Sequence, residues 1–151
     1  MAIYKQTSIS EALRLSDIDQ NWKIHLFNFV DDFRRSKSID LIKEKPESKD
    51  LRLLALSSAV VSELCDELQI PRPDWIKYVV GLKDPWFVSG IENLKATALQ
   101  ESPIYYKIKN VFVFFFSSKK CANFYFPHAF VGWGFLIVFD TDLHSSARED
   151  E

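Results

Sequence analysis

Residues 50–70 carry a continuous helical periodicity, and the rest of the fold has to be built around this segment. Side chains that are apolar or small recur there at spacings of three and four residues: Leu51, Leu54, Ala55, Ser58, Val61, Cys65 and Leu68. Positions with this spacing share one face of an α-helix. Asp50 is suited to cap the first turn, whereas Pro71 cannot continue a helix. The pattern therefore predicts a central helix that buries one face.

Two more helices are predicted upstream of the central one. Ser8 and Glu11 have the spacing of a capping box, which predicts a short helix over residues 9–15. Asp17 is expected to cap the next helix, and the negative charge of Asp19 then suits its first turn. The apolar stripe of that second helix comprises Trp22, Leu26, Phe29, Val30 and Phe33. The charged residues between these positions are expected mostly to face water: Asp31, Asp32, Arg34 and Arg35.

Shorter helical segments are predicted over residues 38–45, 74–80, 92–101 and 104–109. Prolines and a glycine separate them, because proline is tolerated at a helix start but not in its interior. Asp84 and Pro85 predict a tight turn that presents Trp86 and Phe87. Together these segments predict a mainly α fold, a small bundle of about five helices over residues 1–110.

The sequence pattern changes after Asn110. Nine of the thirteen phenylalanines lie between Phe112 and Phe139, and the helical spacing disappears. Aromatic and β-branched runs suit strands, so residues 111–139 are predicted to be an aromatic extension that forms a β-hairpin or an extended arm. Residues 140–151 are acidic and are predicted to be a disordered tail.

Other interpretations of this extension stay open. Its longest segment without a charged residue, Ala122–Phe139, has 18 residues, fewer than the roughly 20 that a membrane-spanning helix needs. A membrane-associated protein attached by this tail is therefore an alternative. An exposed hydrophobic edge would instead favour self-association between copies. A shifted reading frame would also produce such an abrupt loss of caps and periodicity.

The charge of the chain argues against a nucleic-acid partner. The formal net charge is −2, so no positive field covers the domain. The best basic cluster comprises Lys43, Lys45, Lys49 and Arg52. Acidic residues interleave with these cations, as is typical of a solvated connection, so we expect no nucleic acid to bind there.

Few residues indicate catalysis or metal binding. Cys65 could pair with His25 as a thiolate and its base, but Cys65 falls on the apolar stripe of the central helix. Asp17 and Asp19 resemble a magnesium-binding carboxylate pair that lacks a phosphate-binding loop. His128 has no second ligand nearby in sequence. We expect no metal, no cofactor and no catalytic centre, with a small enzyme that uses Cys65 or Asp17 and Asp19 as the alternative.

The two cysteines, Cys65 and Cys121, lie in no metal-binding spacing and indicate no disulfide framework. The first residues have neither the basic start nor the apolar run of a secretory signal. A reducing cytoplasm is therefore the expected location.

Residues 70–113 carry one recognisable set of motifs. These are Pro73 with Trp75, the tripeptide Pro85-Trp86-Phe87, the helix LKATALQESP at residues 94–103, and the stretch from Tyr106 to Val113 that contains Asn110. In this pattern the chain resembles a family of small bacterial helical proteins, and the resemblance covers about half of its length. Members of that family look like partners of nucleotidyltransferase-type proteins, in an arrangement similar to toxin and antitoxin pairs.

The resemblance implies a non-catalytic protein-binding module, an antitoxin-like protein that restrains a nucleotidyltransferase-type toxin. Large amphipathic side chains beside prolines suit either a protein core or an interface hot spot. The candidate interface residues are Trp75, Trp86, Phe87, Tyr105, Tyr106, Lys107 and Lys109. Similar proteins carry arginine where this chain has Lys107 or Lys109, and a lysine does not make the bidentate contacts of an arginine.

Overall fold

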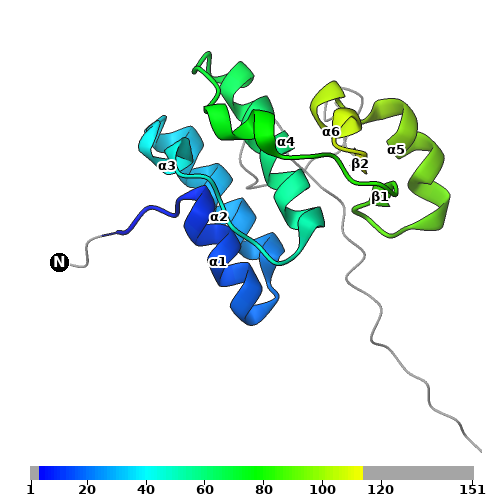
Figure 1. The fold of residues 1–151 in the computed structure, drawn as a ribbon, viewed down its shortest axis with the longest axis horizontal. Helices are drawn as coiled ribbons and strands as arrows, with labels where there is room; N and C mark the ends of the chain where they lie inside the picture. Colours follow the sequence, from blue (N-terminus) through cyan, green and yellow to red (C-terminus); the bar gives the residue numbers. More distant parts are fainter. Residues whose placement is uncertain (1–3, 114–151) are drawn as a thin grey trace, which may run out of the picture. The chain divides into compact units, whose positions relative to one another are not determined.

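A computed structural model describes residues 4–113 of the chain (Figure 1). Six α-helices, two 3₁₀ helices and two short strands occur within that range, so the predicted mainly α fold is confirmed. The chain divides into two compact units. Within the described residues, the first unit comprises residues 4–86 and 103–111, and the second comprises residues 87–102 and 112–113.

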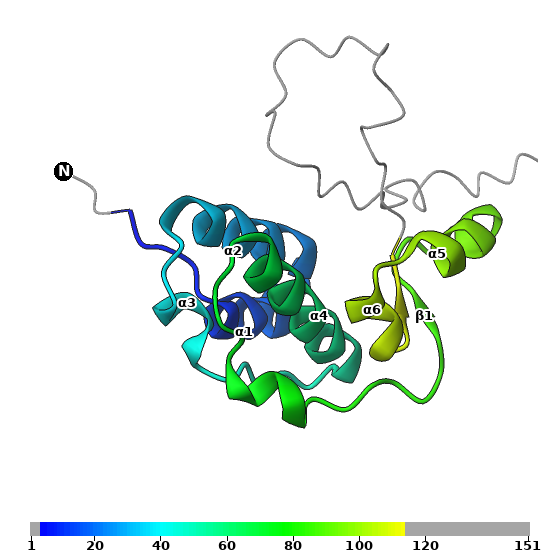
Figure 2. The same ribbon diagram turned by 90° about the horizontal axis from the view of Figure 1, so that it is seen from above.

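The first unit is built on three long helices: α1 (Ile9–Asp19), α2 (Trp22–Ser36) and α4 (Leu51–Glu67). These helices pack on one another (Figures 1 and 2). The short α3 (Asp40–Lys43) packs on α1, and α6 (Ile104–Ile108) packs on α4. The core includes Phe29 and Phe33 of α2, whose rings stack with their centroids 5.8 Å apart.

The central helix α4 begins as predicted. The Asp50 carboxylate accepts a hydrogen bond from the Arg52 N–H at 2.9 Å, which caps the first turn. The buried part of α4 starts at Leu53, and Leu51 is 70% exposed, so the predicted apolar stripe is wrong at its first position. Beyond Leu53 the helix is buried on several sides, because α1, α2 and α6 all pack against it.

The predicted boundary between the first two helices is wrong. Helix α1 continues to Asp19, so Asp17 lies in its last turn and does not cap α2. The Asp17 carboxylate instead accepts hydrogen bonds from the Ser48 hydroxyl at 2.9 Å and the Lys49 N–H at 3.3 Å. Ser48 and Lys49 lie 31 and 32 residues after Asp17, so no local sequence pattern could predict this contact.

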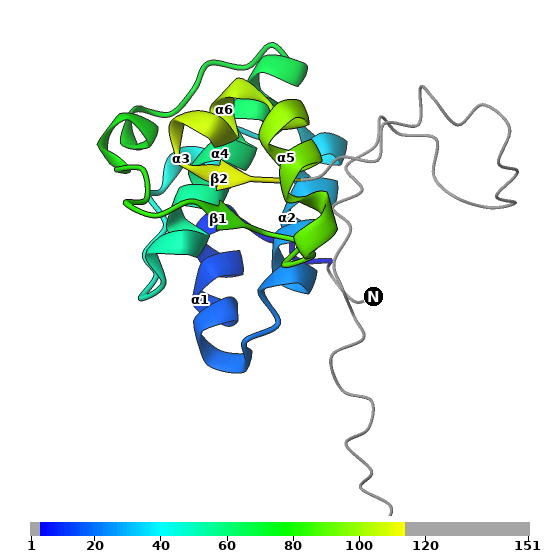
Figure 3. The ribbon, with the colours of Figure 1, turned by 90° about the vertical axis from the view of Figure 1, so that its right-hand side faces the viewer.

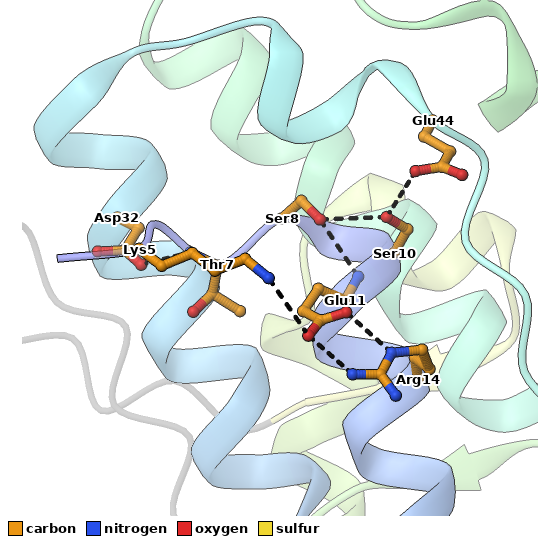
Figure 4. Close-up of polar contacts among 8 residues, drawn as sticks. All are labelled: Lys5, Thr7, Ser8, Ser10, Glu11, Arg14, Asp32 and Glu44. Atoms are coloured by element: carbon orange, nitrogen blue, oxygen red, sulfur yellow. Dashed lines mark hydrogen bonds and ion pairs between the residues drawn. The ribbon is translucent and has the colours of Figure 1, made fainter. Parts of the chain in front are cut away.

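Only half of the predicted capping box forms at the start of α1. The Ser8 hydroxyl accepts a hydrogen bond from the Glu11 N–H at 3.2 Å, as predicted. The Glu11 carboxylate, however, receives two hydrogen bonds from the guanidinium of Arg14 (Figure 4). Arg14 lies one turn further along α1 and offers a charged donor, which the carboxylate binds in place of a backbone N–H.

Asp32 on α2 does not face water, contrary to the prediction from its position. It is 1% exposed, and its two carboxylate oxygens accept hydrogen bonds from the Tyr4 hydroxyl at 2.7 Å and the Thr7 N–H at 2.8 Å. The segment before α1 therefore runs along α2. Asp32 supplies the acceptors for the polar groups of this segment.

The segment between α4 and the second unit contains the 3₁₀ helix η1 (Asp74–Tyr78), which replaces the short helix predicted over residues 74–80. Gly81 follows it. A Cβ atom at Gly81 would lie 2.9 Å from the carbonyl oxygen of Ile108, so the close approach of this segment to the end of α6 requires a glycine.

The second unit, as far as the structure describes it, contains the 3₁₀ helix η2 (Glu92–Leu94) followed directly by α5 (Lys95–Glu101). These two elements account for the helix predicted over residues 92–101. Ser102 ends α5, and its hydroxyl accepts a hydrogen bond from the Val113 N–H at 2.9 Å. The serine of the ESP motif thus fixes the position of the chain after the second strand.

A two-stranded sheet joins β1 (Trp86–Phe87) and β2 (Val111–Phe112), and Figure 3 shows the strands side by side. The Trp86 N–H donates to the Asn110 carbonyl in the first unit, and the Val88 N–H donates to the Phe112 carbonyl in the second, both at 3.0 Å. The sequence pattern did not predict β1.

The interpretations of residues 114–151, namely a hairpin or arm, a disordered acidic tail, a membrane anchor or a contact between copies, lie outside the described residues. None of the helices within residues 4–113 combines the length and the apolar character that crossing a bilayer requires.

Candidate functional site

Two of the candidate interface residues, Trp75 and Tyr106, lie in the core of the first unit. Trp75 is 6% exposed, and its indole Nε1–H donates a hydrogen bond to the Ile42 carbonyl oxygen at 2.8 Å. The buried Tyr106 hydroxyl donates to the Glu63 carboxylate at 2.6 Å. Burial raises the pKa of Glu63 and, together with that carboxylate, raises the pKa of Tyr106 well above its ordinary value. Both aromatic residues hold elements of the unit together.

Tyr105 belongs to a cluster with Asp66 and Arg72 in the first unit. Its hydroxyl donates to the Asp66 carboxylate, which raises the pKa of Tyr105. The Arg72 guanidinium donates twice to the same carboxylate, at 2.6 Å and 3.1 Å, and lies 5.1 Å from the centre of the Tyr105 ring. These hydrogen bonds lower the pKa of Asp66. Tyr105 is half-buried and its polar end is occupied inside the unit.

Trp86 and Phe87 are also half-buried, and each has aromatic and cationic neighbours within its own unit. The Trp86 ring lies 6.0 Å from that of Trp22, with the Arg52 guanidinium 5.8 Å from its centre. The Phe87 ring stacks on Phe112 at 5.2 Å. Both residues lie in β1, where the sequence predicted a tight turn, and each keeps part of its ring accessible.

Of the two candidate lysines, Lys109 has its ammonium group engaged inside the first unit. The Lys109 Nζ donates to the carbonyl oxygens of Val79 and Ile76, the latter at 3.3 Å, and burial lowers its pKa. Lys109 therefore holds the end of η1 against the end of α6. Lys107 is half-exposed. The next motif residue, Asn110, has a positive φ of 58° and donates from its side chain to the Leu82 carbonyl at 3.2 Å.

The residues considered for catalysis are not brought together. Cys65 is completely buried, and this burial raises the pKa of its thiol to about 11, so the thiol stays protonated at neutral pH. His25 bonds instead to Asp19, with the Nε2 and Oδ2 atoms 2.8 Å apart. Asp17 is directed to Ser48 and Lys49, as described above. Within residues 4–113, no group of three or more His, Cys, Asp or Glu side chains could hold a metal ion. Cys121 and His128 lie outside the described residues.

An exposed apolar surface next to α6 was not predicted from the sequence. Four large side chains there are each between 59% and 83% exposed: Tyr78, Val80, Ile104 and Ile108. We call these four residues the α6 surface. They come from two segments held side by side, because the Leu82 N–H donates to the Lys109 carbonyl at 3.0 Å and Gly81 lies against Ile108. The spacing of four residues between Ile104 and Ile108 was the one available signal.

A concave groove with a volume of about 380 Å³ lies in the same unit. Three cations line it together with apolar and aromatic residues; the lining residues are Ile39, Lys43, Lys45, Pro71, Arg72, Pro73, Asp74 and Trp75. We call it the basic groove. Lys43 and Lys45 belong to the cluster that the sequence indicated as a solvated connection. The structure brings them opposite Arg72, which is 29 and 27 positions later in the sequence.

Comparisons with known proteins find no match: no family model, no curated protein and no solved structure matches this chain.

Proposed function

We propose that this chain is a non-catalytic protein-binding module and that the α6 surface contacts its partner. The observation that carries the proposal is the exposure of four large apolar side chains, two on α6 and two on the segment that leads to its end. Single exposed apolar residues are common on protein surfaces, but a group of them is typical of an interaction site. Ile104 and Ile108 are one helical turn apart, so a groove on a partner could receive both.

The α6 surface requires additional contacts for a stable complex. Removing its four side chains from water contributes roughly 1 kcal/mol each, while loss of translational and rotational freedom alone costs about 4–15 kcal/mol. Lys83 and Lys107 flank the apolar residues in sequence and are exposed or half-exposed. Positive groups at the rim favour a partner with an acidic surface, because charge complementarity speeds association and suppresses wrong partners.

The finer proposal concerns the kind of partner. The resemblance described above supports a nucleotidyltransferase-type protein, which this chain would restrain as an antitoxin-like partner in the cytoplasm. Restraint requires no chemistry from this chain: a bound module blocks an active surface sterically. The protonated, buried thiol of Cys65 is consistent with such a role.

The test is co-purification with the product of the neighbouring gene, followed by titration calorimetry. The double substitution Ile104→Gln and Ile108→Gln should weaken the complex at least tenfold, because two apolar anchors are lost. Ile24→Gln is the matched control, since Ile24 is also an exposed isoleucine on a helix, α2, at 58% exposure. It should change the affinity less than twofold. No complex at micromolar concentration, or equal effects of the two variants, would refute the proposal.

A further inference from the structure

We propose that the basic groove binds a short acidic peptide segment of the partner protein. The inference rests on the proposed function and adds a second contact of different chemistry. The groove is formed where the end of α3 faces the segment of residues 71–75, so its two walls come from parts of the chain that are distant in sequence.

The two walls are held in place before any ligand arrives. The hydrogen bond from the Trp75 indole to the Ile42 carbonyl joins one wall to the residue directly before Lys43 in the other wall. Pro71 and Pro73 stiffen the second wall, because proline fixes φ. Because the groove is already formed, little conformational entropy is lost when a ligand binds, and this favours affinity.

The charges in the groove are not balanced. Arg72 is paired with Asp66 at 2.6 Å, and Asp74 is paired with Lys77 at 2.8 Å. Among residues 4–113, no ion pair involves Lys43 or Lys45.

The acidic residue between these two lysines, Glu44, accepts a hydrogen bond from the Ser10 hydroxyl on α1 at 3.0 Å (Figure 4). Glu44 is therefore directed to α1 and is not among the residues that line the groove. The two lysines leave the groove with a positive charge that a carboxylate would complement.

The size and composition of the groove favour a peptide over a nucleic acid. A volume of about 380 Å³ is at the lower end of ligand-sized clefts, roughly 300–1,000 Å³, so it accommodates a short segment. Apolar side chains of a peptide would contact Ile39 and the two prolines, while its carboxylates pair with the lysines. Tight nucleic-acid binding uses on the order of 6–10 phosphate contacts, and two uncompensated lysines cannot supply them.

The test uses the full-length chain and a fluorescein-labelled ten-residue peptide that alternates glutamate with leucine and proline. Fluorescence anisotropy should show binding that weakens as salt increases. The double substitution Lys43→Gln and Lys45→Gln should weaken binding at least tenfold. Lys37→Gln with Lys49→Gln removes the same charge from exposed lysines that do not line the groove, and should change binding less than twofold.

Three outcomes would overturn the inference. The first is an equal effect of the two double variants on peptide binding. The second is equal binding of a peptide with glutamine in place of each glutamate. The third is that a single-stranded RNA binds more tightly than the peptide and loses this binding when Lys43 and Lys45 are substituted. The last outcome would assign the groove to nucleic acid.

The two proposals can fail separately. If the Lys43 and Lys45 variant binds the partner protein as the native chain does, the groove inference is wrong and the α6 proposal stands. If the Ile104 and Ile108 variant binds the partner normally, the α6 proposal is wrong. The peptide-binding experiment then still shows whether the basic groove binds an acidic segment.

Discussion

Replacing Trp75 with phenylalanine tests whether this residue is a structural part of the first unit. The substitution keeps an aromatic ring in the same place but removes the indole N–H that donates to the Ile42 carbonyl at 2.8 Å. Because Trp75 is almost completely buried, no water can easily replace that donor. The carbonyl oxygen of Ile42 then loses its side-chain partner.

The expected loss of stability has two parts. An unsatisfied buried polar group costs about 1–3 kcal/mol. The smaller ring also buries roughly 40 Å² less apolar surface, which at about 25 cal/mol per Å² amounts to about 1 kcal/mol. The free energy of unfolding should therefore fall by about 2–4 kcal/mol. At roughly 4 °C per kcal/mol for a chain of this size, the melting temperature should drop by about 8–16 °C.

Trp86→Phe is the matched control, because it makes the same chemical change in the same unit. Trp86 is half-buried, and no hydrogen bond of its indole N–H is found among residues 4–113. Its interaction with Arg52 weakens on a phenyl ring, so a loss below about 1 kcal/mol is expected. Urea unfolding followed by far-ultraviolet circular dichroism measures both variants. Losses that agree within about 0.5 kcal/mol would refute the reasoning from burial and hydrogen bonding.

Two further substitutions test polar contacts in the first unit. Burial raises the pKa of Glu63, so the folded state binds its proton more tightly than the unfolded state does. The resulting stability is full below the ordinary pKa of 4.5 and is lost as the pH rises through the folded-state pKa. In Glu63→Gln this loss of stability with rising pH should disappear. The free energy of unfolding of the variant, compared with that of the native chain in urea, should therefore be more favourable at pH 7 than at pH 4.5. An unchanged pH profile would contradict the assignment. Asp32→Ala should cost about 2–3 kcal/mol, because Asp32 accepts from Thr7 and Tyr4. It should also accelerate hydrogen exchange at the Thr7 amide, whereas Tyr4→Phe, at an exposed residue, should cost less than about 1 kcal/mol. Unaltered exchange at Thr7 would show that Asp32 does not hold this segment.

The candidate site was only partly accessible to sequence reasoning. The aromatic and basic motif residues were picked out from the sequence, but their pattern did not separate core from surface. Three of the predicted residues form hydrogen bonds inside the first unit: Trp75, Tyr106 and Lys109. The more exposed Val80 and Ile108 were not predicted as interface residues. An apolar residue in a short segment looks the same in sequence whether or not another element covers it. Only the packing around α6 distinguishes these cases.

Local signals in the sequence located most of the helices. The caps Ser8 and Asp50 act over four residues or fewer, so they need no knowledge of the rest of the chain. Helix α4 ends at Glu67, before the end that Pro71 predicted. The packing of distant segments decided the burial of Asp32 against Thr7, the pairing of β1 with β2, and the meeting of Lys43 with Arg72 across the basic groove. The physical reason is that these contacts form only after the long loops of chain between the two partners have closed. Their partners are therefore chosen by the fold as a whole, and no periodicity or short motif encodes them.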